Sequence, residues 1–461
     1  MSGARTIVSV LAALVLSAGV SAPALQAQAQ AQGLIQALAP AQASTQTPAQ
    51  AQAQAIIITN AEIHTISGEV IQGGTIVVED GRITAVAPAG TAPPTPPNAR
   101  TIDAGGRIVT PGFLESSTQL GIVAMGAEPG PADATVTNPR VTASFNVLDG
   151  FDPNAMAIPV TRIEGITRAI VRPNPGVSLI AGQGILVDLR TGDAVVERVH
   201  ANPVGMFAVL GQGGSARAGG ARGAATQQLR EALQDARDHD QNRSAFEAGN
   251  RRDYAFSRLD LEAMALVLTG EIPLVVQVHR ASDIRAALRM KEEFGIRLIL
   301  FGALEGWMVA DEIRDAGVPV VINPMLNLPG MESLGATLEN AARLHEAGVT
   351  VALSSFDTDN ARNLKQVAGN AVANGLPHDA ALRAVTLTPA EIWGIEERFG
   401  SIEVGKEADL VIWSGDPFEL DTRAEHVIIA GREIPLESRQ IDLFNRYRTI
   451  GGPGGPGGPP R

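Results

Sequence analysis

The sequence predicts an α/β fold built on a parallel sheet, and three observations support this prediction. Four apolar runs at residues 274–278, 297–301, 319–322 and 350–353 consist mainly of Val, Ile and Leu, and amphipathic segments separate the first three. Apolar strands that alternate with helices are typical of a parallel sheet covered on both faces. The 461 residues, 45% of them hydrophobic, are enough for a large barrel and a smaller domain.

The segments between these strands predict two helices. At residues 282–294, apolar positions recur with helical spacing, and we expect Ser282 and Asp283 to cap the helix and Gly295 to end it. Residues 304–316 repeat the pattern. Helices of this length can connect successive parallel strands.

The strand ends carry the candidate functional residues. In parallel sheets with helical crossovers, functional side chains lie at the carboxyl ends of the strands. The ends of the four strands carry His279, Phe301, Asn323 and, after Ser354, Ser355 and Phe356, Asp357. Of these, His279 and Asp357 could bind a metal ion or a proton.

Both chain termini have unusual compositions. Residues 1–29 combine an early positive charge, a short apolar run and small residues, which predicts a cleavable export signal; an uncleaved anchor is the alternative. Residues 30–54 are rich in Ala and Gln and predict a disordered linker, and residues 446–461 predict a disordered Gly/Pro-rich tail. We therefore expect an exported protein of the periplasm or cell envelope, without a stable membrane span.

Charge and residue usage exclude several classes of function. The formal net charge of −13 gives no positive field for phosphate groups, so we expect no nucleic-acid partner. The chain has no Cys, which excludes disulfides, thiolate metal sites and a Cys nucleophile. Only three Lys are present, and none precedes Lys291.

Short strands with turn signals occur near both ends of the folded region. Residues 55–110 and 400–445 contain these strands, whereas residues 111–399 contain the strand and helix units. A small sheet domain made from both ends of the chain, with the barrel inserted between them, is the simplest arrangement.

Four segments resemble a known family. Residues 63–81, 106–115, 386–390 and 400–413 are similar to the amidohydrolase superfamily, and most of all to its imidazolonepropionase-like branch. The resemblance implies a distorted (β/α)8 TIM-like barrel inserted in a composite β-sandwich built from both termini. It also implies metal-assisted hydrolysis of C–N bonds other than peptide bonds.

Compared with that family, most metal-ligand positions are substituted. The paired histidines of the first strand fall on Ser117 and Gln119, the bridging lysine aligns with Phe207, and the histidine of the sixth strand falls on Phe301. Catalytic zinc normally needs three protein ligands and an open position. The resemblance therefore implies a degenerate metal site that holds at most one divalent metal such as zinc.

Two groups of the family set have counterparts here. His279 fits one metal-ligand position, and Asp357 fits the catalytic aspartate if the alignment shifts by one residue from Phe356. The alternatives are a hydrogen-bonded pocket histidine and an aspartate that caps a helix near residue 361. Glu115 stands at the family's acidic position and could accept hydrogen bonds in the pocket. Glu115, Ser117, Gln119, Phe207, Phe301 and Asn323 form the expected substrate pocket.

Three hypotheses follow. In the first hypothesis, the chain is an amidohydrolase-like enzyme whose hydrolysis is weak or altered, or an inactive pseudoenzyme. Alternatively it is a non-catalytic scaffold, in a homo-oligomer or in a hetero-oligomer with an intact paralogue. In the third hypothesis, the chain is a module that binds a small molecule in the pocket that corresponds to the family's substrate pocket.

Overall fold

The computed structural model describes residues 55–124, 132–192 and 194–448, which fall in one compact unit. The predicted export signal at residues 1–29 and the predicted linker at residues 30–54 lie outside the described residues. Within the described part of the chain, no helix has the length and apolar character that crossing a bilayer requires.

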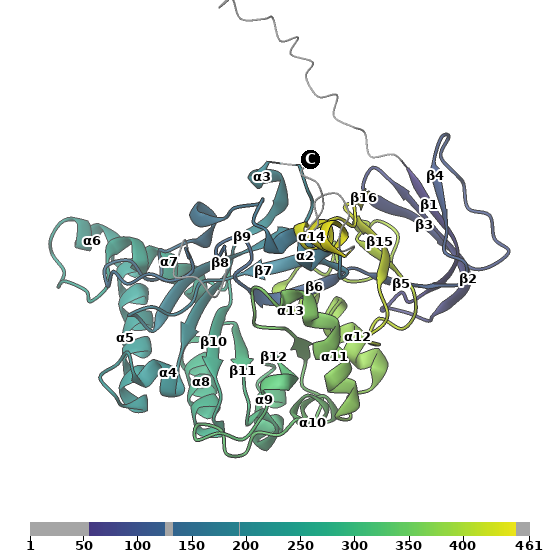
Figure 1. Cartoon of the computed structure of the whole chain (residues 1–461). Helices are drawn as coiled ribbons and strands as arrows, with labels where there is room; N and C mark the ends of the chain where they lie inside the picture. The colour runs from purple at the N-terminus through teal and green to yellow at the C-terminus, as the bar shows by residue number, and fades with distance from the viewer. Residues whose placement is uncertain (1–54, 125–131, 193, 449–461) are drawn as a thin grey trace, which may run out of the picture. The chain divides into compact units, whose positions relative to one another are not determined.

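One eight-stranded sheet forms the barrel, with strand order β13-β12-β11-β10-β9-β8-β7-β6 (Figure 1). The strands are β6 (Phe113–Thr118), β7 (Ile166–Val171), β8 (Ile180–Asp188), β9 (Val199–Val209), β10 (Leu274–Val278), β11 (Leu298–Gly302), β12 (Val320–Ile322) and β13 (Val351–Leu353). All neighbours pair in parallel except β8, which runs antiparallel to both β7 and β9. The predicted fold class, a distorted TIM-like barrel, is confirmed.

Helices connect the strands and follow the last of them. The α-helices are α2 (Ala157–Arg162), α3 (Val195–Arg198), α4 (Gly211–Ser215), α5 (Arg222–Gln241), α6 (Arg243–Glu247), α7 (Arg258–Leu268), α8 (Ala281–Phe294), α9 (Ala310–Asp315), α10 (Asn340–Glu346), α11 (Leu364–Ala373), α12 (His378–Ala384), α13 (Leu387–Trp393) and α14 (Arg439–Tyr447). Four short 3-10 helices are η1 (Val147–Gly150), η2 (Gly306–Val309), η3 (Pro324–Leu326) and η4 (Ala361–Asn363). Helix α14 extends past residue 446, where the sequence places the start of the tail; residues 449–461 lie outside the described residues.

The helix predicted at residues 282–294 is α8, and it ends at a left-handed Gly295 with φ of 68°. Its predicted cap is wrong. Arg280 is the N-cap residue, without a side-chain cap bond, and Ser282 and Asp283 lie inside the helix. The N–H of Ala281 instead donates to the carboxylate of Glu305, 3.0 Å away. A group distant in sequence therefore satisfies the helix end in place of a local cap.

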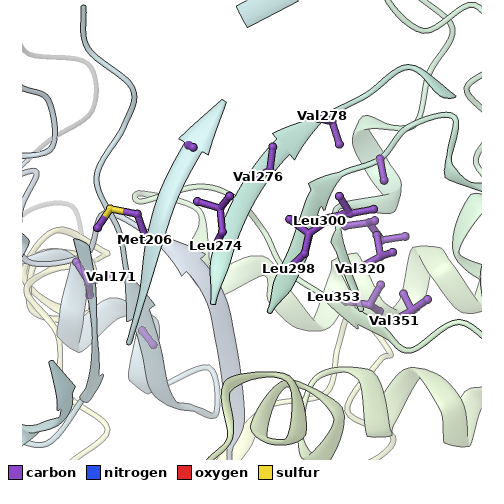
Figure 2. Close-up of a cluster of buried hydrophobic side chains, with 14 of the residues drawn as sticks. Val171, Met206, Leu274, Val276, Val278, Leu298, Leu300, Val320, Val351 and Leu353 are labelled. Carbon is purple, nitrogen blue, oxygen red and sulfur yellow. The ribbon is translucent and has the colours of Figure 1, made fainter. Parts of the chain in front are cut away.

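The strands alternate between two hydrophobic environments, as a period of two requires. Figure 2 shows side chains of one face, including Val276 and Leu300, which belong to the same buried cluster as Ile284 of α8. The intervening residues Val275 and Phe301 belong to a separate cluster inside the barrel. Alternate residues of these strands therefore face the barrel interior.

A second sheet is made from both ends of the folded region, as predicted, with the order β16-β15-β14-β5-β1-β2-β3 and β4 paired to β1. Its purple and yellow strands can be followed in Figure 1. They are β1 (Ile56–Ile63), β2 (Ile71–Glu79), β3 (Arg82–Ala87), β4 (Arg100–Asp103), β5 (Ile108–Pro111), β14 (Leu410–Trp413), β15 (Ala424–Ile429) and β16 (Arg432–Ile434). One face of this sheet has its own hydrophobic core, which includes Ile58, Leu410 and Ile428. Val411, Trp413 and Val427, on the opposite face of β14 and β15, belong to the same buried cluster as the barrel.

A buried ion-pair network ties the barrel to the segment before β14. Arg168 of β7 is 1% exposed and pairs with Asp409 and with Glu407, the latter at 2.9 Å. Its guanidinium also lies 3.6 Å from the ring centre of Phe399. Asp409 additionally accepts a hydrogen bond from the N–H of Ala430 at 2.8 Å. The acidic residues of the segment at residues 400–413 therefore join three parts of the chain.

Candidate functional site

A cavity of about 360 Å³ opens at the carboxyl ends of the parallel strands. It is lined by Arg172, Gln277, His279, Phe301, Gly302, Leu304, Asn323, Leu326 and Phe356. This is the end at which barrels of this type place their functional side chains. Arg172 directly follows β7, and His279 directly follows β10.

The strand period explains which side chains reach the cavity. Val275 lies in the cluster inside the barrel, and Gln277 and His279 follow it at intervals of two residues. Phe301 occupies the inward face of β11 in the same way. The sequence therefore determines this part of the lining through strand alternation alone.

Aromatic rings form one wall of the cavity. The ring of Phe301 lies 5.8 Å from that of Phe207 and 5.5 Å from that of Phe356, measured between centroids. Trp393 lies 6.2 Å from both Phe207 and Phe301 and extends the group into the barrel. Phe356 has a φ of 55°, a strained conformation for a residue with a side chain, and such strain is concentrated at functional sites.

His279 is packed closely against the backbone of β11. A Cβ atom at Gly302, whose φ is +86°, would lie 2.4 Å from the His279 ring, so only glycine fits there. Within the described part of the chain, the Nδ1 atom is buried without a hydrogen-bond partner, and Nε2 lies 3.4 Å from the Gln277 amide nitrogen. Desolvation by burial lowers the pKa of His279, so the neutral imidazole is favoured.

Glu115 lies behind the cavity, at the seam between β6 and β13, the two ends of the barrel sheet. Its carboxylate accepts hydrogen bonds at 3.0 Å from the N–H groups of Ser117 and Ser355, and a short one from the Ser354 hydroxyl. Burial raises the pKa of Glu115 to about 7, against the opposing effect of these hydrogen bonds. Glu115 thus joins the first and last strands of the barrel through side-chain contacts.

Arg172 lies between this seam and the cavity. Its Nε donates to the Ser117 hydroxyl at 2.6 Å, and its Nη1 donates to the carbonyl of Pro173 at 3.1 Å and to Asn174 Oδ1 at 2.8 Å. Desolvation by burial lowers the pKa of Arg172 to about 10, with Glu115 acting in the opposite direction. Only neutral oxygens accept these hydrogen bonds from the guanidinium.

The remaining predicted site residues have structural contacts. Gln119 donates to Asn174 at 3.2 Å and accepts from Thr358 at 3.1 Å. Asn323 lines the cavity, but its amide is engaged by the backbone of two neighbouring loops. The carboxylate of Asp357 accepts hydrogen bonds from the backbone and side chain of Asn360, directly before η4.

The structure therefore divides the predicted site into two groups. His279, Phe301 and Asn323 line the cavity, and Phe207 borders a small adjoining space. Glu115, Ser117, Gln119 and Asp357 do not line the cavity and belong to the hydrogen-bonded layer beside it.

Sequence reasoning missed Arg172 and Gln277. The signal for Gln277 was available, because it lies two residues before His279 in an apolar strand. Arg172 was missed because β7 pairs with the antiparallel strand β8, an arrangement that the strand and helix pattern does not predict.

The residues around the cavity do not fit a catalytic metal centre. Such a centre needs about three histidine, carboxylate or thiolate ligands. In the described ranges, no group of three or more His, Asp, Glu or Cys side chains is arranged to hold a metal ion. The cavity offers one imidazole, two amides and a guanidinium, and guanidinium repels cations.

Known proteins are similar to this chain in sequence. The model of the amidohydrolase family matches residues 164–434. The amidohydrolase TasK of Hapsidospora irregularis is 23% identical over 392 residues, which are 78% of this chain and 39% of that protein. The 5-methylthioadenosine/S-adenosylhomocysteine deaminase of Desulforudis audaxviator (strain MP104C) is 25% identical over 391 residues, 78% of this chain and 84% of the deaminase.

A solved structure gives the same result. The amidohydrolase from Thermotoga maritima MSB8 superposes with a TM-score of 0.74 and 28% sequence identity. The match covers 82% of this chain and 99% of the other. The barrel and the sheet built from both termini are therefore a known combination.

Proposed function

Because this chain belongs to the amidohydrolase family, we propose that it is an exported member whose barrel binds a small molecule, with weak or absent metal-dependent hydrolysis of C–N bonds. We place it in the imidazolonepropionase-like branch, with most metal-ligand positions substituted. One observation carries the proposal: the cavity contains a single imidazole, and three phenylalanine rings stand beside it.

The physical reason is the energy of a charge in this environment. A divalent cation loses its hydration when it enters a protein site, and only several anionic or strongly dipolar ligands can replace that hydration. Phe207, Phe301 and Phe356 supply none, and Arg172 adds a positive charge. Burial of the rings instead stabilises the barrel interior.

The experiment measures metal content and turnover on one preparation. The protein is loaded with zinc or manganese, desalted and analysed by inductively coupled plasma mass spectrometry, then assayed with hydantoin, dihydrouracil and 5-methylthioadenosine. We expect far less than one metal per chain, and turnover that is weak or absent. A stoichiometric metal with chelator-sensitive turnover that His279→Ala abolishes would refute the proposal.

Export is tested separately. A fusion of the full chain to a reporter that is active only outside the cytoplasm should be active, and deletion of residues 1–29 should abolish that activity. Activity that survives the deletion would contradict the proposed signal.

A second candidate is a non-catalytic subunit that pairs with an intact paralogue. It is favoured by exposed apolar side chains in η3 and in the loop that follows it: Met325, Leu326, Leu328, Met331 and Leu334. Such exposure is typical of protein interfaces. The tagged protein, purified from its own cell envelope, should then carry a second amidohydrolase-family chain in equal amount; a lone monomer would contradict this candidate.

A further inference from the structure

We propose that the cavity binds a small aromatic carboxylic acid, whose carboxylate pairs with Arg172 and whose ring packs against Phe301 and Phe356. This inference rests on the proposed function of the barrel as a small-molecule site, and it names the chemical class of the ligand.

The hydrogen-bond donors of Arg172 are only partly engaged within the described residues. A guanidinium has five N–H donors. The Nε donor and both Nη1 donors are engaged by Ser117, Pro173 and Asn174. Within the described residues, Nη2 makes no hydrogen bond, although Arg172 lines the cavity. Two donors of one nitrogen are thus available for a ligand.

The charge of Arg172 also favours an anionic ligand. Within the described part of the chain, no carboxylate forms an ion pair with Arg172. Arg172 is partly buried, and a partly buried charge without a counter-ion is unfavourable. An anion from solution that pairs with this guanidinium is therefore stabilised. Glu115 acts on Arg172 from a distance, and its raised pKa, about 7, limits its negative charge at neutral pH.

The other walls of the cavity suit an aromatic ring in shape and chemistry. Phe301 and Phe356 present ring surfaces, and Leu304 and Leu326 add apolar contacts. The volume of about 360 Å³ suits a single substituted ring and lies in the range of ordinary ligand sites.

The charge of the cavity also selects among anions. Arg172 is the one charged side chain of its lining, and the pKa of His279 is lowered. One positive charge matches a monocarboxylate better than a phosphate ester, which carries about two negative charges and needs more donors. A carboxylate with an apolar body therefore fits this lining best.

Isothermal titration calorimetry with phenylacetate and the uncharged phenylacetamide tests the proposal. The two probes differ only in the group that would face Arg172. We expect phenylacetate to bind at least tenfold more tightly, and Arg172→Gln to remove this preference. Equal affinity for the two probes, no binding of either, or a preference that persists in folded Arg172→Gln would overturn the proposal.

Arg172 also holds the layer behind the cavity, so a second pair of variants does not depend on its replacement. Leu326, the last residue of η3, and Leu328, two residues later, are both 57% exposed, and of the two only Leu326 lines the cavity. Leu326→Glu should weaken phenylacetate binding at least fivefold through charge repulsion, whereas Leu328→Glu should not. Equal effects of the two variants would contradict the proposed site.

The metal analysis of the same preparation separates the two proposals. If phenylacetate does not bind and metal is absent, the proposed ligand class is wrong, but the proposed lack of a hydrolytic metal centre is not contradicted. If the protein contains stoichiometric metal and turns over an amide, the proposed function itself fails.

Discussion

Replacement of Glu115 by Gln is expected to change how the stability of this protein depends on pH. Glu115 is fully buried, and burial raises its pKa from 4.5 to about 7. A carboxyl group with a raised pKa binds its proton more tightly in the folded than in the unfolded chain. The stability that it contributes is therefore present below pH 4.5 and is lost as pH rises through about 7.

The magnitude follows from the shift. A rise from 4.5 to about 7, at about 1.4 kcal/mol per pH unit, amounts to a loss of about 3 kcal/mol in the free energy of unfolding. Because the group is fully buried, solvent screening does not reduce this figure greatly. Gln is isosteric and does not titrate, so Glu115→Gln lacks this loss.

Urea unfolding of both proteins between pH 4.5 and pH 8 measures the effect. Other groups titrate in this range, but their contributions cancel in the difference between the two proteins. We expect the wild type to lose about 3 kcal/mol relative to Glu115→Gln as pH rises. A constant difference, or a relative gain by the wild type, would show that Arg172 and the donors of Ser354 and Ser355 keep Glu115 ionised.

Two further substitutions test the packing. Gly302→Ala places a Cβ against the His279 ring at a φ of +86° and should lower the free energy of unfolding by about 2 to 4 kcal/mol in chemical denaturation. Gly295→Ala is the control, because Gly295 has a similar φ of 68° but open space around it. An equal loss in the control would refute the steric argument. Asp409→Ala removes one of the two carboxylates that pair with the buried Arg168, and it should lower the free energy of unfolding by about 3 to 5 kcal/mol in the same assay. A loss below about 1 kcal/mol would contradict the role assigned to this ion pair.

The elements that local sequence patterns determine were predicted well. Strand β10 coincides with the apolar run at residues 274–278, and Gly295 ends α8 in the left-handed conformation. Both depend on residues adjacent in the chain. The N-terminus of α8 was predicted wrongly, because Glu305 from a different loop replaces the local cap.

The candidate site was predictable only in part, for the same reason. His279 follows a recognisable strand, so its place at the barrel end could be expected. The environment of Arg172 depends on the contact between β6 and the residues after β13, at the two ends of the barrel sheet, and on the antiparallel strand β8, which are long-range features. Whether Phe356 or Asp357 turns toward the cavity depends on the positive φ of Phe356, which no local pattern predicts for a phenylalanine.

We propose that this barrel keeps the fold and the cavity of an amidohydrolase without the metal centre. The most direct measurement is a crystal soaked with zinc, with anomalous scattering recorded on both sides of the zinc edge. We predict no zinc peak within coordination distance of His279. A fully occupied zinc ion, bound by His279 and at least two other protein groups, would contradict the account.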